Sequence, residues 1–183
     1  KDLIDRKRMI NLLIGKVNKP SRIKVIDAFR NHEARDSTLY SFLEKIKSDN
    51  KDLNKFIKKN QGPIDGAPIS PYDSSTQGWG TSTRAYDDSL ISFICETHET
   101  ADCVFLTEKT YRPIINKSPF VIRAPFPALA YLRSIGFKTF GDYVDESYDE
   151  SCYITDEYSK QLVDCAFSLL KAVPQNYDAV QEI

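Results

Sequence analysis

The sequence predicts an α/β fold: a Rossmann-like, open and mostly parallel sheet flanked by helices, with extra helices at the C-terminal end. Two observations predict it. Short continuous apolar runs, such as MINLLIG at 9–15 and LISFIC at 90–95, are typical of strands that are buried on both faces. These runs alternate with segments in which apolar residues recur at helical spacing, and such alternation favours a parallel sheet.

The first strand is expected to end at Gly15, before a loop that carries Lys16 and Lys19. Ser21 can cap the helix that follows this loop. The last long helix, at 157–173, has one apolar side and is expected to pack on the sheet. The expected strands are 9–15, 38–42, 90–95, 119–122 and 138–140, and the expected helices are 21–31, 49–60, 107–116, 127–135, 157–173 and 177–183.

Length and composition favour one soluble globular domain of 183 residues. The 25 basic and 26 acidic residues give a net charge of −1, so we expect no nucleic-acid partner. No apolar run is long enough to span a membrane, and the charged start of the chain does not resemble a signal peptide. We therefore expect a cytoplasmic or cytoplasm-facing location. Because the chain lacks an initiator Met, we also expect it to be part of a longer chain.

The cysteines do not predict a metal centre. They are widely spaced, contain no C-x-x-C pair, and have only two histidines as further ligands. We expect reduced thiols and no bound metal. The residues concerned are Cys95, Cys103, Cys152, Cys165, His32 and His98.

Two segments are expected to lack regular structure. Residues 61–84 are rich in Gly, Pro, Ser and Thr, and long loops of this kind in compact domains are usually functional or disordered. Trp79 within them could stack on a ligand or anchor the loop to the core. The acidic segment 142–155 lacks the ligand spacing of an EF-hand, so we expect a solvated linker before the C-terminal helices at 156–183.

The stretch 95–123 carries the clearest functional signal. Glu96 directly follows a buried strand, and Thr107 can cap a helix that starts with Glu108 and Lys109. Helix N-termini at the carboxyl ends of parallel strands attract anions, and a Lys there can hold a phosphate. Arg112 shares a helix face with Lys109. The pattern predicts a site for a nucleotide or nucleotide sugar, with a solvated first turn of a helix as the alternative.

Basic residues after the first strand fit the same site. Arg22 is expected to reach phosphate oxygens, because a guanidinium matches them as a fork, whereas Lys16 and Lys19 could equally be surface charges. His98 could act as an acid or base or could contact a base or phosphate, although a lone His in a polar loop often does neither.

The motifs FLTEKTYRPI at 105–114 and SPFVI at 118–122, after a strand that ends in an acid, resemble the C-terminal half of GT-B glycosyltransferases. The resemblance is greatest to the α1,3-fucosyltransferase type. It implies that Glu108 and Lys109 hold the ribose and the diphosphate, and that Glu96 matches the acid of a Phe-Glu-Asn motif. Here Thr97 replaces the Asn, the spacer is slightly longer, and Arg123 stands where the family has a small apolar turn.

The resemblance implies transfer of a sugar from a nucleotide-diphosphate donor to a hydroxyl of a glycan or another acceptor. It implies no cofactor and no essential metal. The catalytic base is expected outside this chain, in an N-terminal GT-B domain. The alternative is a non-catalytic nucleotide-binding or interaction module derived from a glycosyltransferase. A different nucleotide-dependent enzyme has no support, because the sequence has no G-x-G-x-x-G or P-loop motif.

Overall fold

The computed structural model describes residues 3–43, 48–62, 84–98, 103–124, 127–150 and 155–181. They form a four-stranded sheet with the strand order β2-β1-β3-β4, in which all neighbours run parallel. The predicted α/β fold class is thereby confirmed. The strands are β1 (Lys7–Ile14), β2 (Thr38–Phe42), β3 (Ser89–Cys95) and β4 (Phe120–Arg123).

The strand order reverses direction at β1. The chain places β2 on one side of β1 and then returns to place β3 on its other side. In open parallel sheets, ligands bind at the carboxyl ends of the strands next to such a reversal, because the adjoining loops diverge there. The loops that follow β1 and β3 therefore border the position at which this fold favours a ligand.

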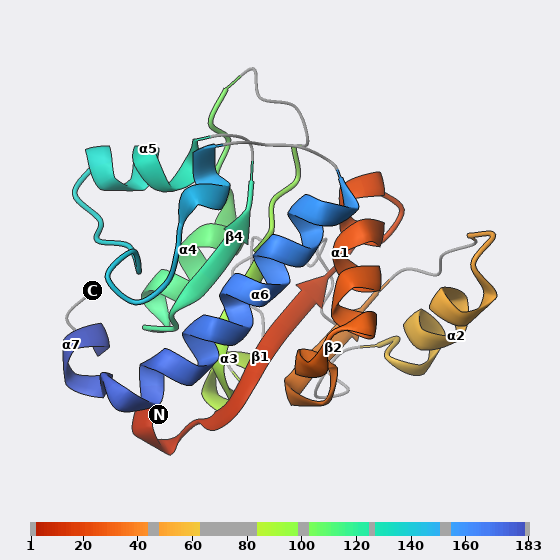
Figure 1. Cartoon of the computed structure of the whole chain (residues 1–183), viewed down its shortest axis with the longest axis horizontal. Helices are drawn as coiled ribbons and strands as arrows, with labels where there is room; N and C mark the ends of the chain where they lie inside the picture. The colour runs from red at the N-terminus through yellow and green to blue at the C-terminus, as the bar shows by residue number, and fades with distance from the viewer. Residues whose placement is uncertain are drawn as a thin grey trace, which may run out of the picture.

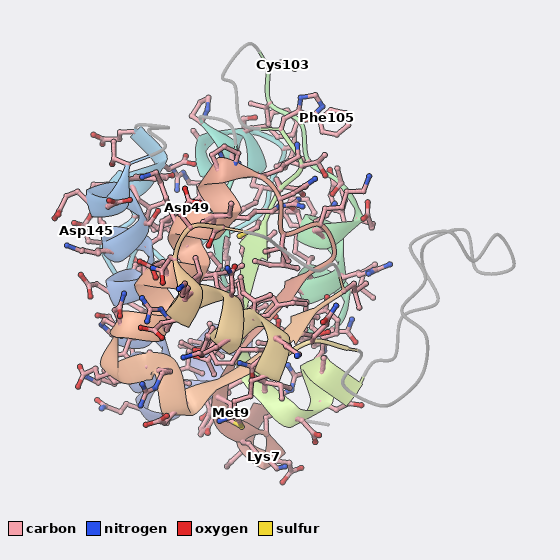
Figure 2. All side chains as sticks on the ribbon, turned by 90° about the vertical axis from the view of Figure 1, so that its right-hand side faces the viewer. Lys7, Met9, Asp49, Cys103, Phe105 and Asp145 are labelled. Atoms are coloured by element: carbon pink, nitrogen blue, oxygen red, sulfur yellow. The ribbon has the colours of Figure 1, made fainter. Side chains whose placement is uncertain are left out.

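Helices cover both faces of the sheet. On one face, α6 (Asp156–Ala172) packs against α1 (Pro20–Asn31) and contacts β1, β3 and β4 (Figure 1). On the opposite face, α3 (Arg84–Asp88) and α4 (Glu108–Ile115) contact β3, so that the sheet lies between α6 and α4 (Figure 2). The remaining helices are α2 (Lys51–Lys59), α5 (Ala128–Ser134) and α7 (Tyr177–Gln181), with 3-10 turns at Leu3–Asp5, Glu33–Ser37, Ser147–Glu150 and Val173–Gln175.

Strand β3 lies at the centre of the core, and all of its residues are buried. Its neighbour β1 contributes Ile10 and Leu12, which are both fully buried. The one polar side chain in the middle of β1, Asn11, donates to Ser89 Oγ at 2.6 Å and to Ser92 Oγ at 2.9 Å. A buried amide without such partners would destabilise the sheet, so these two serines explain why the apolar run tolerates an asparagine.

Two local predictions are wrong. Residues 138–140 do not form a strand; the Phe140 N–H donates instead to Glu146 Oε1 at 2.8 Å, while the ring packs edge-on against Phe120. Ser21 does not cap α1. The helix begins one residue earlier, at Pro20, because the fixed φ of proline suits the first helical position and its missing N–H is not needed there.

The acidic segment also differs from the expected solvated linker. Tyr148 is 1% exposed, and the carboxylate of Asp149 accepts hydrogen bonds of 2.9 Å from the N–H groups of both Leu129 and Ala130. The segment therefore packs on the core and caps the first turn of α5. A further difference is α3, which was not among the expected helices. Residues 63–83, including Trp79, lie outside the described residues, so the prediction for Trp79 remains a prediction.

Among the described residues, no helix is both long and apolar enough to cross a membrane. The predicted cellular location remains a prediction.

The capping role of Asp149 predicts that Asp149→Ala lowers the free energy of unfolding by about 1–2 kcal/mol, because two N–H groups of α5 lose a charged acceptor. Urea unfolding followed by circular dichroism measures this change. Asp142→Ala, in the same segment but exposed, is the control. Equal losses for the two variants would show that Asp149 does not cap α5.

Candidate functional site

The carboxylate of Glu96 is the centre of the network at the end of β3. It is fully buried, yet it lies in a loop rather than in the sheet. Its Oε1 accepts from the Thr107 N–H at 2.8 Å and from Thr110 Oγ1 at 2.7 Å. Its Oε2 accepts from Thr107 Oγ1 at 2.6 Å and from the Thr97 N–H at 3.3 Å. Both oxygens are therefore satisfied within the protein, and the carboxylate fixes the first turn of α4 to the end of β3.

Helix α4 begins where the sequence predicted. Thr107 is its N-cap, with an extended backbone and a hydroxyl that lies 3.4 Å from the Lys109 N–H. Glu108 and Lys109 thus occupy the first turn of a helix that follows β3 across a loop. The prediction of their position is confirmed, whereas the ribose and diphosphate roles remain predictions.

The ammonium group of Lys109 is surrounded by oxygen atoms. Its Nζ lies 2.9 Å from Thr107 Oγ1, 3.1 Å from Thr97 Oγ1 and 3.1 Å from Glu108 Oε1. Glu96 Oε2 is 3.8 Å away, close enough for an ion pair. An ammonium has three N–H donors, so a ligand oxygen would bind to Lys109 by replacing one of these three partners.

Lys19 approaches the same place from the loop after β1. Its Nζ donates to the main-chain oxygen of Thr97, while Lys109 donates to the hydroxyl of the same residue. Two ammonium groups, one from the loop after β1 and one from the first turn of α4, therefore meet at Thr97. Lys19 has no carboxylate partner among the described residues, so its charge is less compensated than that of Lys109.

Arg22 is placed differently from its predicted role as a phosphate fork. The residue is 4% exposed, and its Nη1 donates to Lys16 O at 2.7 Å. Its Nη2 donates to Cys95 O at 3.3 Å and to Glu96 O at 3.2 Å. Both terminal nitrogens are thus used by main-chain carbonyls. In this arrangement, Arg22 joins the loop after β1 to the end of β3 and positions the site rather than presenting a free fork.

Arg123, at the end of β4, holds the next part of the loop. It is 2% exposed and donates from Nη1 to His98 O at 2.8 Å. His98 itself is exposed, and its ring lies on that of Phe105, with the centroids 4.5 Å apart. No described residue gives the His98 ring a carboxylate partner, so the geometry offers no charge relay that would favour an acid–base role.

Glu108 is the more accessible of the two carboxylates, with 39% of its side chain exposed against none for Glu96. Partial burial opposes its ionisation, but the charge and the hydrogen bond of Lys109, together with the charge of Arg112, lower its pKa below the ordinary value. Glu108 is therefore ionised at neutral pH and can accept hydrogen bonds from hydroxyl groups. Arg112 lies one turn further along α4. Burial raises the pKa of Tyr86, and the charge of Arg112 partly offsets this rise.

Positive charge is concentrated here although the chain as a whole has a net charge of −1. Within the described parts of the two loops, the first turn of α1, α4 and the end of β4, cationic side chains outnumber carboxylates. In the same described residues, no cluster of three His, Cys, Asp or Glu side chains could hold a metal ion. The cations are Lys16, Lys19, Arg22, Lys109, Arg112 and Arg123, and the carboxylates are Glu96 and Glu108.

Sequence reasoning did not assign roles to several residues that build the site. Thr97, Thr110 and Arg123 each make a buried or partly buried contact that fixes the loop. Lys19 was noted as a basic residue but could not be separated from surface lysines. Of these residues, only Arg123 gave a signal in the sequence. An arginine at the end of an apolar strand is expected to be buried, and a buried arginine needs hydrogen-bond partners nearby.

No protein-family model matches the chain, and no curated protein or solved structure matches it either. The resemblance to GT-B glycosyltransferases therefore has no independent support from these comparisons, and the family remains a prediction.

The network predicts that Glu96→Ala lowers the free energy of unfolding by about 3 kcal/mol or more, because three buried donors of Thr107 and Thr110 lose their acceptor. Glu96→Gln should cost less, since the Thr107 hydroxyl can rotate to accept from the new amide. Chemical denaturation measures both variants. Glu33→Ala, at an exposed carboxylate, is the control, and a loss no larger than that of this control would contradict the structural role of Glu96.

The cysteines give a second prediction. Burial raises the pKa of the Cys95 thiol to about 11 and that of Cys165 to about 12, whereas Cys103 is exposed. Because the thiolate is the reactive form, only Cys103 should react quickly with iodoacetamide at pH 7.5 in a Cys152→Ser variant. Mass spectrometry of the labelled native protein tests this expectation, with the urea-unfolded protein as the control. Labelling of Cys95 as fast as that of Cys103 would contradict the buried position.

Proposed function

We propose that the carboxyl edge of the sheet binds the diphosphate of a nucleotide sugar, and that the chain is the donor-binding domain of a fucosyltransferase-like GT-B glycosyltransferase. One observation carries the proposal. Lys19 lies in the loop after β1 and Lys109 in the first turn of α4, which follows the loop after β3, and both ammonium groups meet at Thr97. This is the edge at which parallel sheets bind ligands, and two cations there match the charge of a diphosphate.

The ligand would replace contacts that the protein makes in its own loop. The Thr97 hydroxyl and carbonyl each accept from one ammonium group, so oxygens of a diphosphate at this place would take over these donors. A phosphate oxygen is a stronger acceptor than a neutral hydroxyl, because charge-assisted hydrogen bonds are about twice as strong. The first-turn N–H groups of α4 would add a favourable dipole.

The reaction requires stabilisation of the departing diphosphate, whose negative charge grows as the bond to the sugar breaks. Fixed ammonium groups and a helix N-terminus stabilise such charge without reorganising at the moment of reaction. Glu108, ionised and partly exposed, is the carboxylate suited to accept from ribose hydroxyls. Glu96 and Arg22 would act as positioning residues, because both carboxylate oxygens of Glu96 and both terminal nitrogens of Arg22 are bonded within the protein.

A non-catalytic nucleotide-binding or interaction module is the second candidate. The observation that favours it is the saturation of Lys109, whose three donors already have partners and which pairs with two carboxylates. A structural role for the network is sufficient to explain these contacts. An assay for release of nucleoside diphosphate from a nucleotide sugar distinguishes the two candidates. An enzyme releases it by sugar transfer or by slow hydrolysis, whereas a non-catalytic module does not.

Lys109→Ala and Lys19→Ala should each weaken binding of GDP or UDP by about 10- to 100-fold, because a charge-assisted contact contributes about 1.5–3 kcal/mol. Lys58→Ala, on the exposed face of α2, is the matched control and should leave the affinity unchanged. Titration calorimetry at fixed ionic strength is the measurement. Equal affinities for Lys109→Ala, Lys19→Ala and Lys58→Ala would remove the proposed diphosphate site.

A further inference from the structure

An exposed aromatic pair lies next in sequence to the residues that hold the two ammonium groups. Phe105 is 43% exposed, and its ring packs against that of the exposed His98 at a centroid separation of 4.5 Å and an interplanar angle of 58°. Figure 2 shows the Phe105 ring standing out from the loop region at one end of the molecule.

The backbone under this pair is held in place on both sides. The His98 carbonyl accepts from the buried guanidinium of Arg123 at 2.8 Å. On the other side, Leu106 packs against the core, and Thr107 is extended and bound to Glu96. The pair therefore rests on fixed positions although both rings reach solvent.

Phe105 lies close in sequence to the residues that hold the ammonium of Lys109. It stands two residues before Thr107, whose hydroxyl lies 2.9 Å from Lys109 Nζ. His98 directly follows Thr97, the residue at which Lys19 and Lys109 meet. The aromatic pair thus lies on the same two stretches of chain that hold the two ammonium groups.

We propose that Phe105, supported by His98, is the platform on which the nucleobase of the ligand stacks. This inference rests on the proposed diphosphate site. A nucleoside diphosphate carries a flat aromatic base at one end and a negatively charged diphosphate at the other, and the site offers one surface for each. An aromatic ring can stack on any of the bases, because every base has a π-face. The platform therefore favours nucleotides over inorganic pyrophosphate without strong selection among bases.

The test compares inorganic pyrophosphate with GDP, UDP and ADP by titration calorimetry. Stacking of one base contributes about 1–3 kcal/mol, which is about 5- to 150-fold in affinity. The wild-type protein should bind the nucleoside diphosphates tighter than pyrophosphate by such a factor. Phe105→Ala and Phe105→Leu should remove most of this difference and leave pyrophosphate affinity unchanged, and His98→Ala should have a smaller effect of the same kind.

Tyr131→Ala, at an aromatic residue of α5 that is 41% exposed, is the matched control and should change neither affinity. Thermal unfolding of every variant confirms that it is folded. If wild-type protein binds pyrophosphate and nucleoside diphosphates equally well, or if Phe105→Ala and Phe105→Leu keep the full difference, the platform is refuted while the diphosphate site stands. If no diphosphate binds to the wild-type protein, the proposed function fails and the platform fails with it.

Discussion

The site depends on one constraint: a carboxylate is buried at the end of the central strand without a hydrogen bond from a charged group. The nearest cation, Lys109, is 3.8 Å from Glu96, so the charge is stabilised mainly by N–H and hydroxyl donors of Thr97, Thr107 and Thr110. These donors belong to the loop and to the first turn of α4. Satisfying Glu96 therefore fixes where α4 begins, and with it the place of Lys109 at the carboxyl edge.

A second set of contacts explains the positive charge at this edge. The chain from Cys95 to His98 leaves the sheet, so the main-chain carbonyls of these residues need hydrogen-bond donors other than a neighbouring strand. Arg22 serves Cys95 and Glu96, while Lys19 serves Thr97 and Arg123 serves His98. Part of the positive charge thus has a structural cause and is not by itself a sign of an anionic ligand. What distinguishes Lys19 and Lys109 is that they meet at a partly exposed residue of the loop.

The sequence was sufficient to predict those helices and strands that are determined by neighbouring residues in the chain. The apolar runs that became β1 and β3, and the capping Thr107 before α4, need no knowledge of distant residues. The failures depend on tertiary partners: Phe140 bonds to Glu146 instead of joining the sheet, and Asp149 caps a helix twenty residues away in sequence. For the site, the sequence placed Glu96 and Lys109 near each other. It could not show that the Glu96 carboxylate and the terminal nitrogens of Arg22 are bonded within the protein, because most of their partners lie on other segments of the chain.

The central claim is that Lys19 and Lys109 form an anion site at Thr97, and an NMR titration with inorganic pyrophosphate tests it most directly. Amide shifts of an isotope-labelled sample locate the bound anion without any assumption about the reaction. The account predicts that the largest saturable shifts fall on Thr97, Glu108 and Lys109, and that they disappear in the Lys109→Ala variant. Saturable shifts centred elsewhere, or the same shifts at Thr97 in that variant, would contradict the account.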